Sequence, residues 1–167
     1  MSGIVALSIS ACAPPLPEPT PSTTVSGFAS QEEAFRAAEA TYRAYIDALN
    51  DVDLADPATF EPVYAWLIGD ALAGSKESFS RMHAEKLSVS GDSSVPRVEP
   101  RVAGREEVVV DACLDVSDVK LVNASGQSVV SQSRKDRQPM RVSFSAARSA
   151  TGLAIHGSVP SDSEICE

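Results

Sequence analysis

Aromatic side chains are scarce in this chain of 167 residues. They make up 5% of it, and only one of them is a tryptophan. The hydrophobic content is nevertheless 43%, so Val, Leu, Ile and Ala must supply most of any core. A chain of this length can form one domain with a substantial core and is short for two.

Basic residues are also in deficit. The chain has 14 Lys and Arg against 23 Asp and Glu, which gives a formal net charge of −9. Nucleic-acid binding depends mainly on Lys and Arg side chains that neutralise phosphates, so we expect no nucleic-acid partner. The same deficit disfavours attachment to an anionic membrane surface by charge alone.

Motifs for metals and phosphates are missing from the sequence. The chain has only two histidines, His83 and His156, and no Cys-x-x-Cys, Gly-rich phosphate loop or Gly-x-Ser-x-Gly motif. We therefore expect neither a metal ion nor another cofactor. Both histidines occur in polar contexts, which favours surface positions over a role as general base. The basic run at residues 134–137 is interpreted as a solvated hairpin loop, with a site for an acidic partner as the alternative.

Long apolar runs are absent too, so we expect no bilayer-spanning segment in the mature protein. The short apolar run at residues 4–9 precedes Ser10-Ala11-Cys12. An aliphatic residue, two small residues and a cysteine resemble the lipobox of bacterial lipoproteins, in which that cysteine is acylated. Residues 1–11 are thus interpreted as the remnant of a signal peptide. They contain no Lys or Arg, so we expect the true start upstream or a trimmed end. The alternative is a frayed terminus with a buried Cys12.

Residues 12–29 are interpreted as the anchor cysteine followed by a tether. Five prolines lie among Ser, Thr and Gly in this stretch: Pro14, Pro15, Pro17, Pro19 and Pro21. Such a composition buries little and favours an extended conformation. The sequence therefore predicts a protein on the extracytoplasmic face of the cell membrane, attached through a lipid on Cys12.

The three cysteines fit this location. Lipidation of Cys12 leaves Cys113 and Cys166, an even pair. Such a pair persists as a disulfide outside the cytoplasm. We predict a Cys113–Cys166 bond that fastens the C-terminus to a strand, and the alternative is two separate thiols.

Residues 30–167 are predicted to form one α+β domain with its helices confined to about residues 31–86. Ser30-Gln31-Glu32-Glu33 is a capping box. Apolar residues then recur at helical spacing to about Asn50. One or two short helices are expected within residues 60–72 and another at 75–86, with Gly69 and Gly74 bracketing a turn between them.

After residue 87 the apolar pattern changes to a period of two, which is typical of strands. Residues 108–117 place valines, Ala112 and Leu114 on one face and Asp111, Cys113 and Asp115 on the other. Further strands are predicted at 127–131, 140–146 and 153–159. Helices followed by a meander predict a curved antiparallel sheet wrapped on the N-terminal helices.

This order of elements resembles the NTF2-like cone fold, and in particular small bacterial lipoproteins of that superfamily with no assigned activity. The resemblance covers residues 30–166. It rests on the lipobox, the tether, paired tyrosines in the first helix, an Asp-Ala-Cys-Leu-Asp strand and a cysteine near the C-terminus. One departure is Leu153, where a tryptophan is expected. The resemblance implies a pocket between the helices and the concave sheet, and the candidates to line it are Tyr42, Tyr45, Tyr64 and Trp66.

Three functions are compatible with this reading. The first is a non-catalytic envelope module that binds a protein, a peptide or a small apolar ligand through the pocket or the exposed sheet. The second is an isomerase, dehydratase or hydrolase that acts on a small apolar substrate with tyrosine hydroxyls and the Asp111 or Asp115 carboxylate. The strand pattern points both aspartates away from the apolar row and toward solvent. The third is a subunit of an envelope secretion or transfer machine. Two or more ionisable groups converging in the pocket would favour an enzyme.

Overall fold

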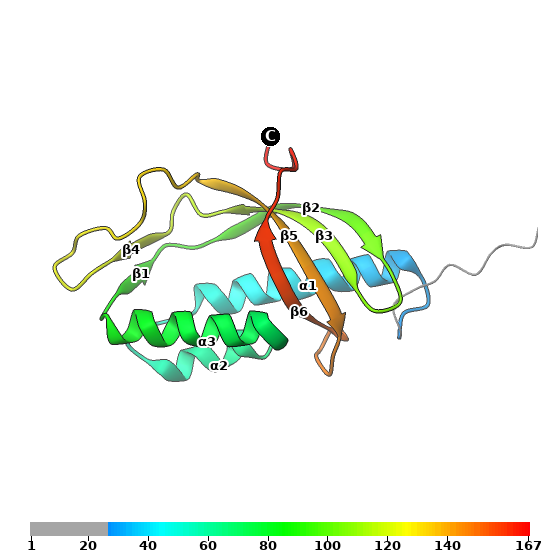
Figure 1. Ribbon diagram of the computed structural model, residues 1–167, viewed down its shortest axis with the longest axis horizontal. Helices are drawn as coiled ribbons and strands as arrows, with labels where there is room; N and C mark the ends of the chain where they lie inside the picture. The colour runs from blue at the N-terminus through cyan, green and yellow to red at the C-terminus, as the bar shows by residue number, and fades with distance from the viewer. Residues whose placement is uncertain (1–26) are drawn as a thin grey trace, which may run out of the picture.

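The computed structural model describes residues 27–167. Cys12, the predicted signal remnant and nearly all of the predicted tether lie outside the described residues. The helical elements are α1 (Gln31–Asn50), the 3-10 helix η1 (Pro57–Phe60), α2 (Glu61–Tyr64) and α3 (Gly69–Ala84) (Figure 1). The strands are β1 (Ser88–Ser90), β2 (Ser94–Ala103), β3 (Val108–Asp115), β4 (Lys120–Val122), β5 (Arg137–Ala146) and β6 (Leu153–Pro160).

The architecture is α+β, with the helices packed against a curved antiparallel sheet, and the predicted fold class is confirmed. The main sheet has the strand order β2-β3-β5-β6. The strands β1 and β4 form a separate two-stranded ribbon, which extends from the main sheet over one end of α3 (Figure 1). We call this ribbon the β1–β4 arm.

Helix α1 begins at the predicted capping box. The Ser30 hydroxyl accepts a hydrogen bond from the Glu33 amide, and the Glu33 carboxylate accepts one from the Ala29 amide. Ala34, Ala38, Tyr42 and Ile46 follow at intervals of four residues and are all buried. This row is the stripe of α1 that faces the sheet.

Helix α3 begins earlier than predicted. The proposed turn between Gly69 and Gly74 is wrong, because both glycines belong to α3. A glycine inside a helix costs about 1 kcal/mol relative to alanine, but this preference is weaker than tertiary packing. Here α3 buries Phe79 against Phe60, with 4.9 Å between the ring centroids.

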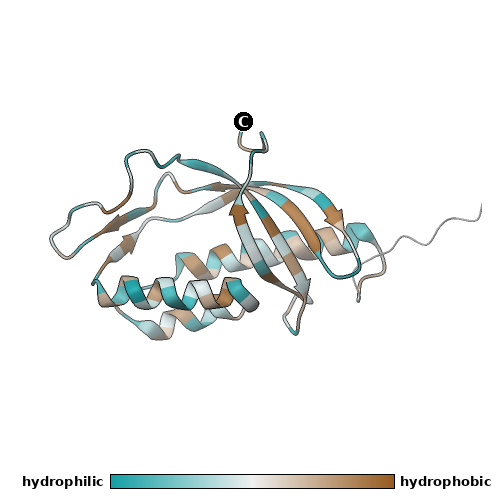
Figure 2. Cartoon of the chain, in the orientation of Figure 1, coloured by the Kyte–Doolittle hydropathy of each residue, from teal (hydrophilic) through white to brown (hydrophobic). Residues whose placement is uncertain are grey.

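The inner face of the main sheet carries the core. Val108 and Val110 of β3 stand opposite Phe144 and Val142 of β5, and all four are buried. Apolar and polar residues alternate along β5 from Met140 to Ser145, whereas β3 begins with three valines in a row. Figure 2 shows hydrophobic and hydrophilic positions mixed along the strands of the main sheet. Leu153, found where the resemblance led us to expect tryptophan, is fully buried at the start of β6.

The predicted strand at residues 127–131 is wrong. This segment makes one isolated bridge, between Val122 and Ser128. The Asn123 side chain bends the chain there, since its Oδ1 atom accepts hydrogen bonds from the amides of Ser125 and Gln127. β4 pairs with β1 instead, and Ser88 stands opposite Val122.

The two edges of the main sheet differ. The edge strand β2 contains Pro96 and Pro100. At the other edge, the segment after α2 lies along β6: the Ile155 amide donates to the Trp66 carbonyl, and the Ile68 amide donates to the Ile155 carbonyl.

Candidate functional site

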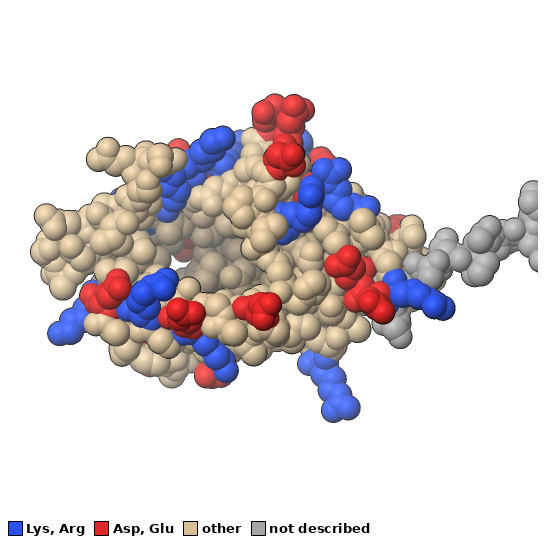
Figure 3. All heavy atoms as spheres, viewed as in Figure 1, with Lys and Arg blue, Asp and Glu red and all other residues tan. Residues whose placement is uncertain are grey.

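A cavity of about 570 Å³ lies between α1, α3 and the strands β5 and β6. Figure 3 shows a hollow on this face, framed by α3, β6 and the β1–β4 arm and walled largely by uncharged residues. The wall consists of Tyr42, Tyr45, Ile46, Leu49, Leu67, Asp70, Ala71, Gly74, Ser75, Ser78, Phe79, Leu114, Met140, Ile155, His156, Gly157, Ser158 and Val159. We call it the large cavity.

A second cavity of about 310 Å³ lies between the end of α1, α3 and the β1–β4 arm, and we call it the small cavity. Its wall consists of Leu49, Asn50, Val52, Leu54, Phe79, Met82, Val89, Ser90, Gly91, Asp92, Ser93, Val119, Leu121, Val130 and Arg134. Leu49 and Phe79 belong to both walls, so the two cavities are neighbours. An occupant of both would be in mainly apolar surroundings.

Tyr42 and Tyr45 contribute two hydroxyl groups to the wall of the large cavity. Their rings are 6.2 Å apart, and only 2% of Tyr42 is exposed. Neither hydroxyl makes a hydrogen bond with any residue from 27 to 167. Burial raises the pKa of both phenols above the ordinary value, so both remain neutral donors at physiological pH.

Tyr64 and Trp66 are not part of either wall, and the prediction that they line the pocket is corrected accordingly. The Tyr64 ring packs against Phe79, with 5.9 Å between centroids, and Lys76 lies 5.2 Å above it. Trp66 contributes its carbonyl to the edge of β6. Tyr64 therefore packs within the fold, and Trp66 contributes a backbone hydrogen bond.

Two further ionisable residues border the large cavity, Asp70 and His156. Asp70 is exposed in the first turn of α3. His156 is partly exposed, and its Nε2 atom lies 3.8 Å from Glu107 Oε2, a residue outside the wall. Within residues 27–167 no hydrogen bond or ion pair joins Asp70 to His156. The other histidine, His83, is exposed on α3, and its Nδ1 atom is 2.7 Å from the Leu54 carbonyl.

Asp111 is on the sheet face opposite the core, as the strand pattern predicts, but it does not point to solvent. Its side chain is 1% exposed, because Arg101 and Arg141 cover it from the neighbouring strands. Burial alone would raise the pKa of this carboxyl, but hydrogen bonds from Arg141 and Arg101 outweigh burial and hold the pKa below its ordinary value. Asp111 is thus an ionised structural group, remote from both cavities.

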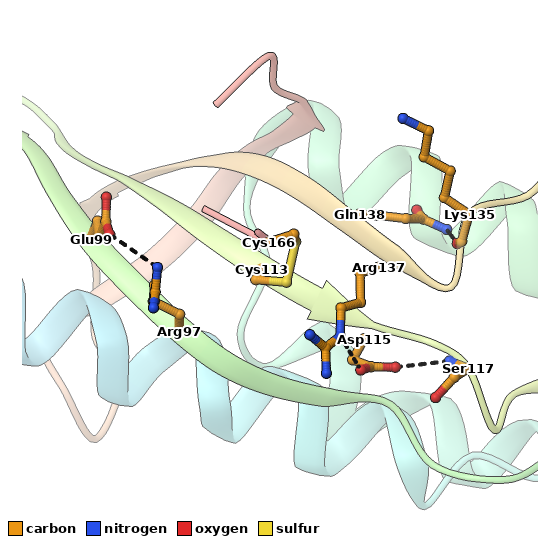
Figure 4. The surroundings of a disulfide bond; sticks show 9 residues. All are labelled: Arg97, Glu99, Cys113, Asp115, Ser117, Lys135, Arg137, Gln138 and Cys166. Atoms are coloured by element: carbon orange, nitrogen blue, oxygen red, sulfur yellow. Dashed lines mark hydrogen bonds and ion pairs between the residues drawn. A yellow bond between two sulfur atoms is a disulfide. The ribbon is translucent and has the colours of Figure 1, made fainter. Parts of the chain in front are cut away.

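Asp115 lies four residues further along β3, on the same face. It accepts hydrogen bonds from the Ser117 amide and from Arg137 Nε, each 3.0 Å long (Figure 4). The bonds from Ser117, together with Arg137, lower the pKa of Asp115 to about 2. Neither aspartate is available to a substrate in the cone.

The structure joins Cys113 and Cys166 by a disulfide, as predicted (Figure 4). Cys113 is 1% exposed on the outer face of β3, the face away from the helices. The tail after β6 crosses that face: the Ser161 amide donates to the Pro139 carbonyl, and Ile165 is buried. The disulfide therefore holds the C-terminal tail against the outer face of the sheet, and neither cysteine belongs to a cavity wall.

The sequence predicts Arg134 in a solvated hairpin loop, with a site for an acidic partner as the alternative, and the structure places it in the small-cavity wall. Its Nη2 atom donates to the carbonyls of Val116 and Val119, at 3.1 and 2.9 Å. A basic residue in a polar run gives no local sign of this position. The contact depends on the return of the loop over β4.

Two kinds of feature are absent from the described residues, a cluster of possible metal ligands and a membrane-crossing helix. Between residues 27 and 167 no group of three or more His, Cys, Asp and Glu side chains is placed to hold a metal ion. No helix in this part of the chain is long and apolar enough to cross a membrane.

Comparison with solved structures identifies the fold. The intermembrane-space region of the chloroplast protein ARC6 matches with a TM-score of 0.54 at 17% identity, over 77% of this chain and 97% of that one. A protein of Novosphingobium aromaticivorans, provisionally assigned as an aromatic ring hydroxylase, matches with a TM-score of 0.50 at 14% identity, over 79% and 96%. Both are NTF2-like proteins, and this chain has the NTF2-like cone fold.

These similarities establish the fold alone, because sites on one fold support many functions. No protein-family model matches the sequence, and the comparison with curated proteins gives no match either. The function must therefore be argued from the cavities themselves.

Proposed function

We propose that this chain is a lipid-anchored protein of the bacterial cell envelope that binds a small, mainly apolar ligand in its cone without transforming it. The observation that carries the proposal is the large cavity, which is walled mainly by apolar side chains. Its Asp70 and His156 are not joined to each other, and the Nε2 atom of His156 lies 3.8 Å from Glu107 Oε2, outside the wall. General acid–base catalysis needs groups positioned together on the reacting atoms.

The tyrosines support a ligand. Tyr42 and Tyr45 both belong to the wall of the large cavity, and their hydroxyls make no hydrogen bond with any residue from 27 to 167. Both hydroxyls are therefore available as donors to a ligand. A mainly apolar ligand that carries an oxygen atom would accept these hydrogen bonds and bury its remaining surface on the cavity wall.

The outer face of the sheet is less suited to docking. The C-terminal tail crosses it and is fastened there by Cys166. An enzyme or a secretion-machine subunit remains the alternative function. The enzyme would need a second acid–base group in the cone, and the subunit would need a partner on the outer face.

Location rests on the sequence. Cys12 follows two small residues and precedes a proline-rich segment long enough to separate the domain from a membrane. We expect Cys12→Ala to move the protein from the membrane fraction to the soluble fraction and to abolish incorporation of labelled fatty acid. A variant that stays in the membrane fraction, with a wild type that takes up no label, would overturn the anchor.

Binding is tested at Gly74, where a Cβ atom would meet no other atom within 4 Å. In the unlipidated Cys12→Ala chain, Gly74→Phe places a large side chain at the cavity wall, and Gly74→Ala is its matched control. We expect the neutral fluorescent probe N-phenyl-1-naphthylamine to bind the Ala variant and to lose at least about tenfold in affinity for the Phe variant, since the cavity is then filled. Equal affinities, or no binding to either variant, would refute the proposal.

A further inference from the structure

Arg134 is a cation without a counter-ion at the small cavity. It is half-buried, and one of its terminal nitrogens is held by the carbonyls of Val116 and Val119. Among residues 27–167 it forms no ion pair, and its remaining donors have no partner. An arginine has five N–H donors in a fixed planar group, so most of its capacity is unused here.

This position is unusual in a chain with a net charge of −9. Six other arginines of the described domain pair with carboxylates: Arg36, Arg43, Arg97, Arg101, Arg137 and Arg141. Asp92 is the one acidic residue in the small-cavity wall. It lies exposed in the turn after β1 and is not paired with Arg134. The two backbone carbonyls thus fix the guanidinium without neutralising it.

Asn50, another polar residue of this wall, already has hydrogen-bond partners. Asn50 exchanges two hydrogen bonds with the backbone of Ser93, each 2.9 Å long. The rest of the wall is largely apolar, from Val130 and Leu121 beside Arg134 to Leu49 and Phe79. Beyond these two residues the large cavity begins.

We propose that the ligand is a single-chain amphiphile whose anionic head group binds Arg134 and whose alkyl chain passes Leu49 and Phe79 into the large cavity. This inference rests on the proposed function and specifies the ligand class for the same site. A carboxylate or phosphate group matches the planar donors of arginine. The apolar walls remove the chain from water, and each buried methylene adds about fourfold to the affinity.

The test ligand is dodecanoate, and dodecanol and dodecylammonium are its neutral and cationic comparisons. The affinity of each is measured by its displacement of N-phenyl-1-naphthylamine from the unlipidated Cys12→Ala chain. We expect dodecanoate to bind at least about tenfold more tightly than the other two, because a hydrogen bond to a charged group is worth more than a neutral one.

Arg134→Gln is the decisive variant. We expect it to weaken dodecanoate about tenfold and to leave dodecanol within about twofold. Retained dodecanol binding shows that the cavity is still folded. The matched control is Arg148→Gln, which removes the same charge from an exposed residue outside both walls. It is expected to leave both affinities unchanged. Asp92→Asn removes the acid from the same wall and is expected to tighten dodecanoate binding.

The outcomes separate this inference from the proposed function. Equal binding of dodecanoate and dodecanol, or an equal loss for both in Arg134→Gln, would overturn the head-group assignment while the cavity function stands. Tighter dodecylammonium binding would also overturn it and would assign the head group to Asp92. A chain that binds the fluorescent probe but none of the three amphiphiles refutes the inference alone, whereas a chain that binds no probe refutes both.

Discussion

The Cα atom of Cys166 lies 5.1 Å from that of Cys113, so the penultimate residue is fastened to the middle of the sheet. The two residues are 53 positions apart in the sequence. In the chain-entropy model, closing a loop of this length stabilises the fold by about 4 kcal/mol. The bond acts mainly by restricting the unfolded chain.

The double variant Cys113→Ser/Cys166→Ser should therefore lose about 4 kcal/mol of unfolding free energy, measured by urea titration. The wild type should show reactive thiols at these positions only after reduction. Two free thiols in protein purified from an oxidising compartment would contradict the bond.

Asp111 should make a measurable contribution to stability. Asp111→Asn removes the charge that Arg101 and Arg141 share while leaving both arginines on the sheet. Breaking a fully buried pair costs more, but both arginines are partly exposed, so we expect a loss of about 1–2 kcal/mol. Glu99→Gln is the control, because the Arg97–Glu99 pair is 4.0 Å long and both side chains are 55% exposed. Urea titrations with equal midpoints for the two variants would contradict this role of Asp111.

The lowered pKa of Asp115 predicts that the free energy of unfolding depends on pH. Its pKa is about 2 in the folded chain against an ordinary value of 3.8, so the folded state favours the ionised form. The stabilisation is complete above pH 3.8 and is lost as the pH falls toward 2. We expect the difference in urea midpoint between wild type and Asp115→Asn to be constant from neutrality to about pH 4 and to shrink below it. A difference that grows on acidification would have the wrong sign.

Two glycines should respond oppositely to alanine. Gly74→Ala should raise the unfolding free energy by about 1 kcal/mol, because Gly74 is helical and a Cβ there meets open space. Gly91 has φ +79°, and a Cβ there would overlap the backbone carbonyl of Asp118. Gly91→Ala should therefore cost more than about 1 kcal/mol and disturb the wall of the small cavity. Thermal unfolding measures both, and shifts of the same sign would contradict the comparison.

The elements with a clear period were the ones that could be predicted from sequence. The capping box and the spacing of Ala34, Ala38 and Tyr42 located α1, and the alternation around Asp111 located β3. The edge strand β2 was not singled out, since Pro96, Pro100 and several charged residues interrupt its pattern. The start of α3 could not be predicted from Gly69 and Gly74, because the packing of Phe79 outweighs the low helix propensity of glycine.

The candidate site was only partly predictable. Tyr42 lies on the buried stripe of a long helix, and that stripe is visible in the sequence. Tyr45 lies one helical turn further and also lines the large cavity, partly buried. Arg134 and Leu54 meet in one wall only through tertiary packing, because they are 80 positions apart along the chain. The coverage of Asp111 likewise depends on the strand order, which brings Arg101 and Arg141 to its two sides.

The edges of the main sheet bear on how copies of this protein meet one another. Open strand edges are templates for pairing with another chain. On one side, Pro96 and Pro100 each remove a backbone donor from β2. On the other, the segment around Trp66 already occupies the hydrogen-bonding groups of Ile155. Neither edge presents an unbroken row of partners, so even a dense layer of these domains on one surface would resist growth into continuous intermolecular sheets.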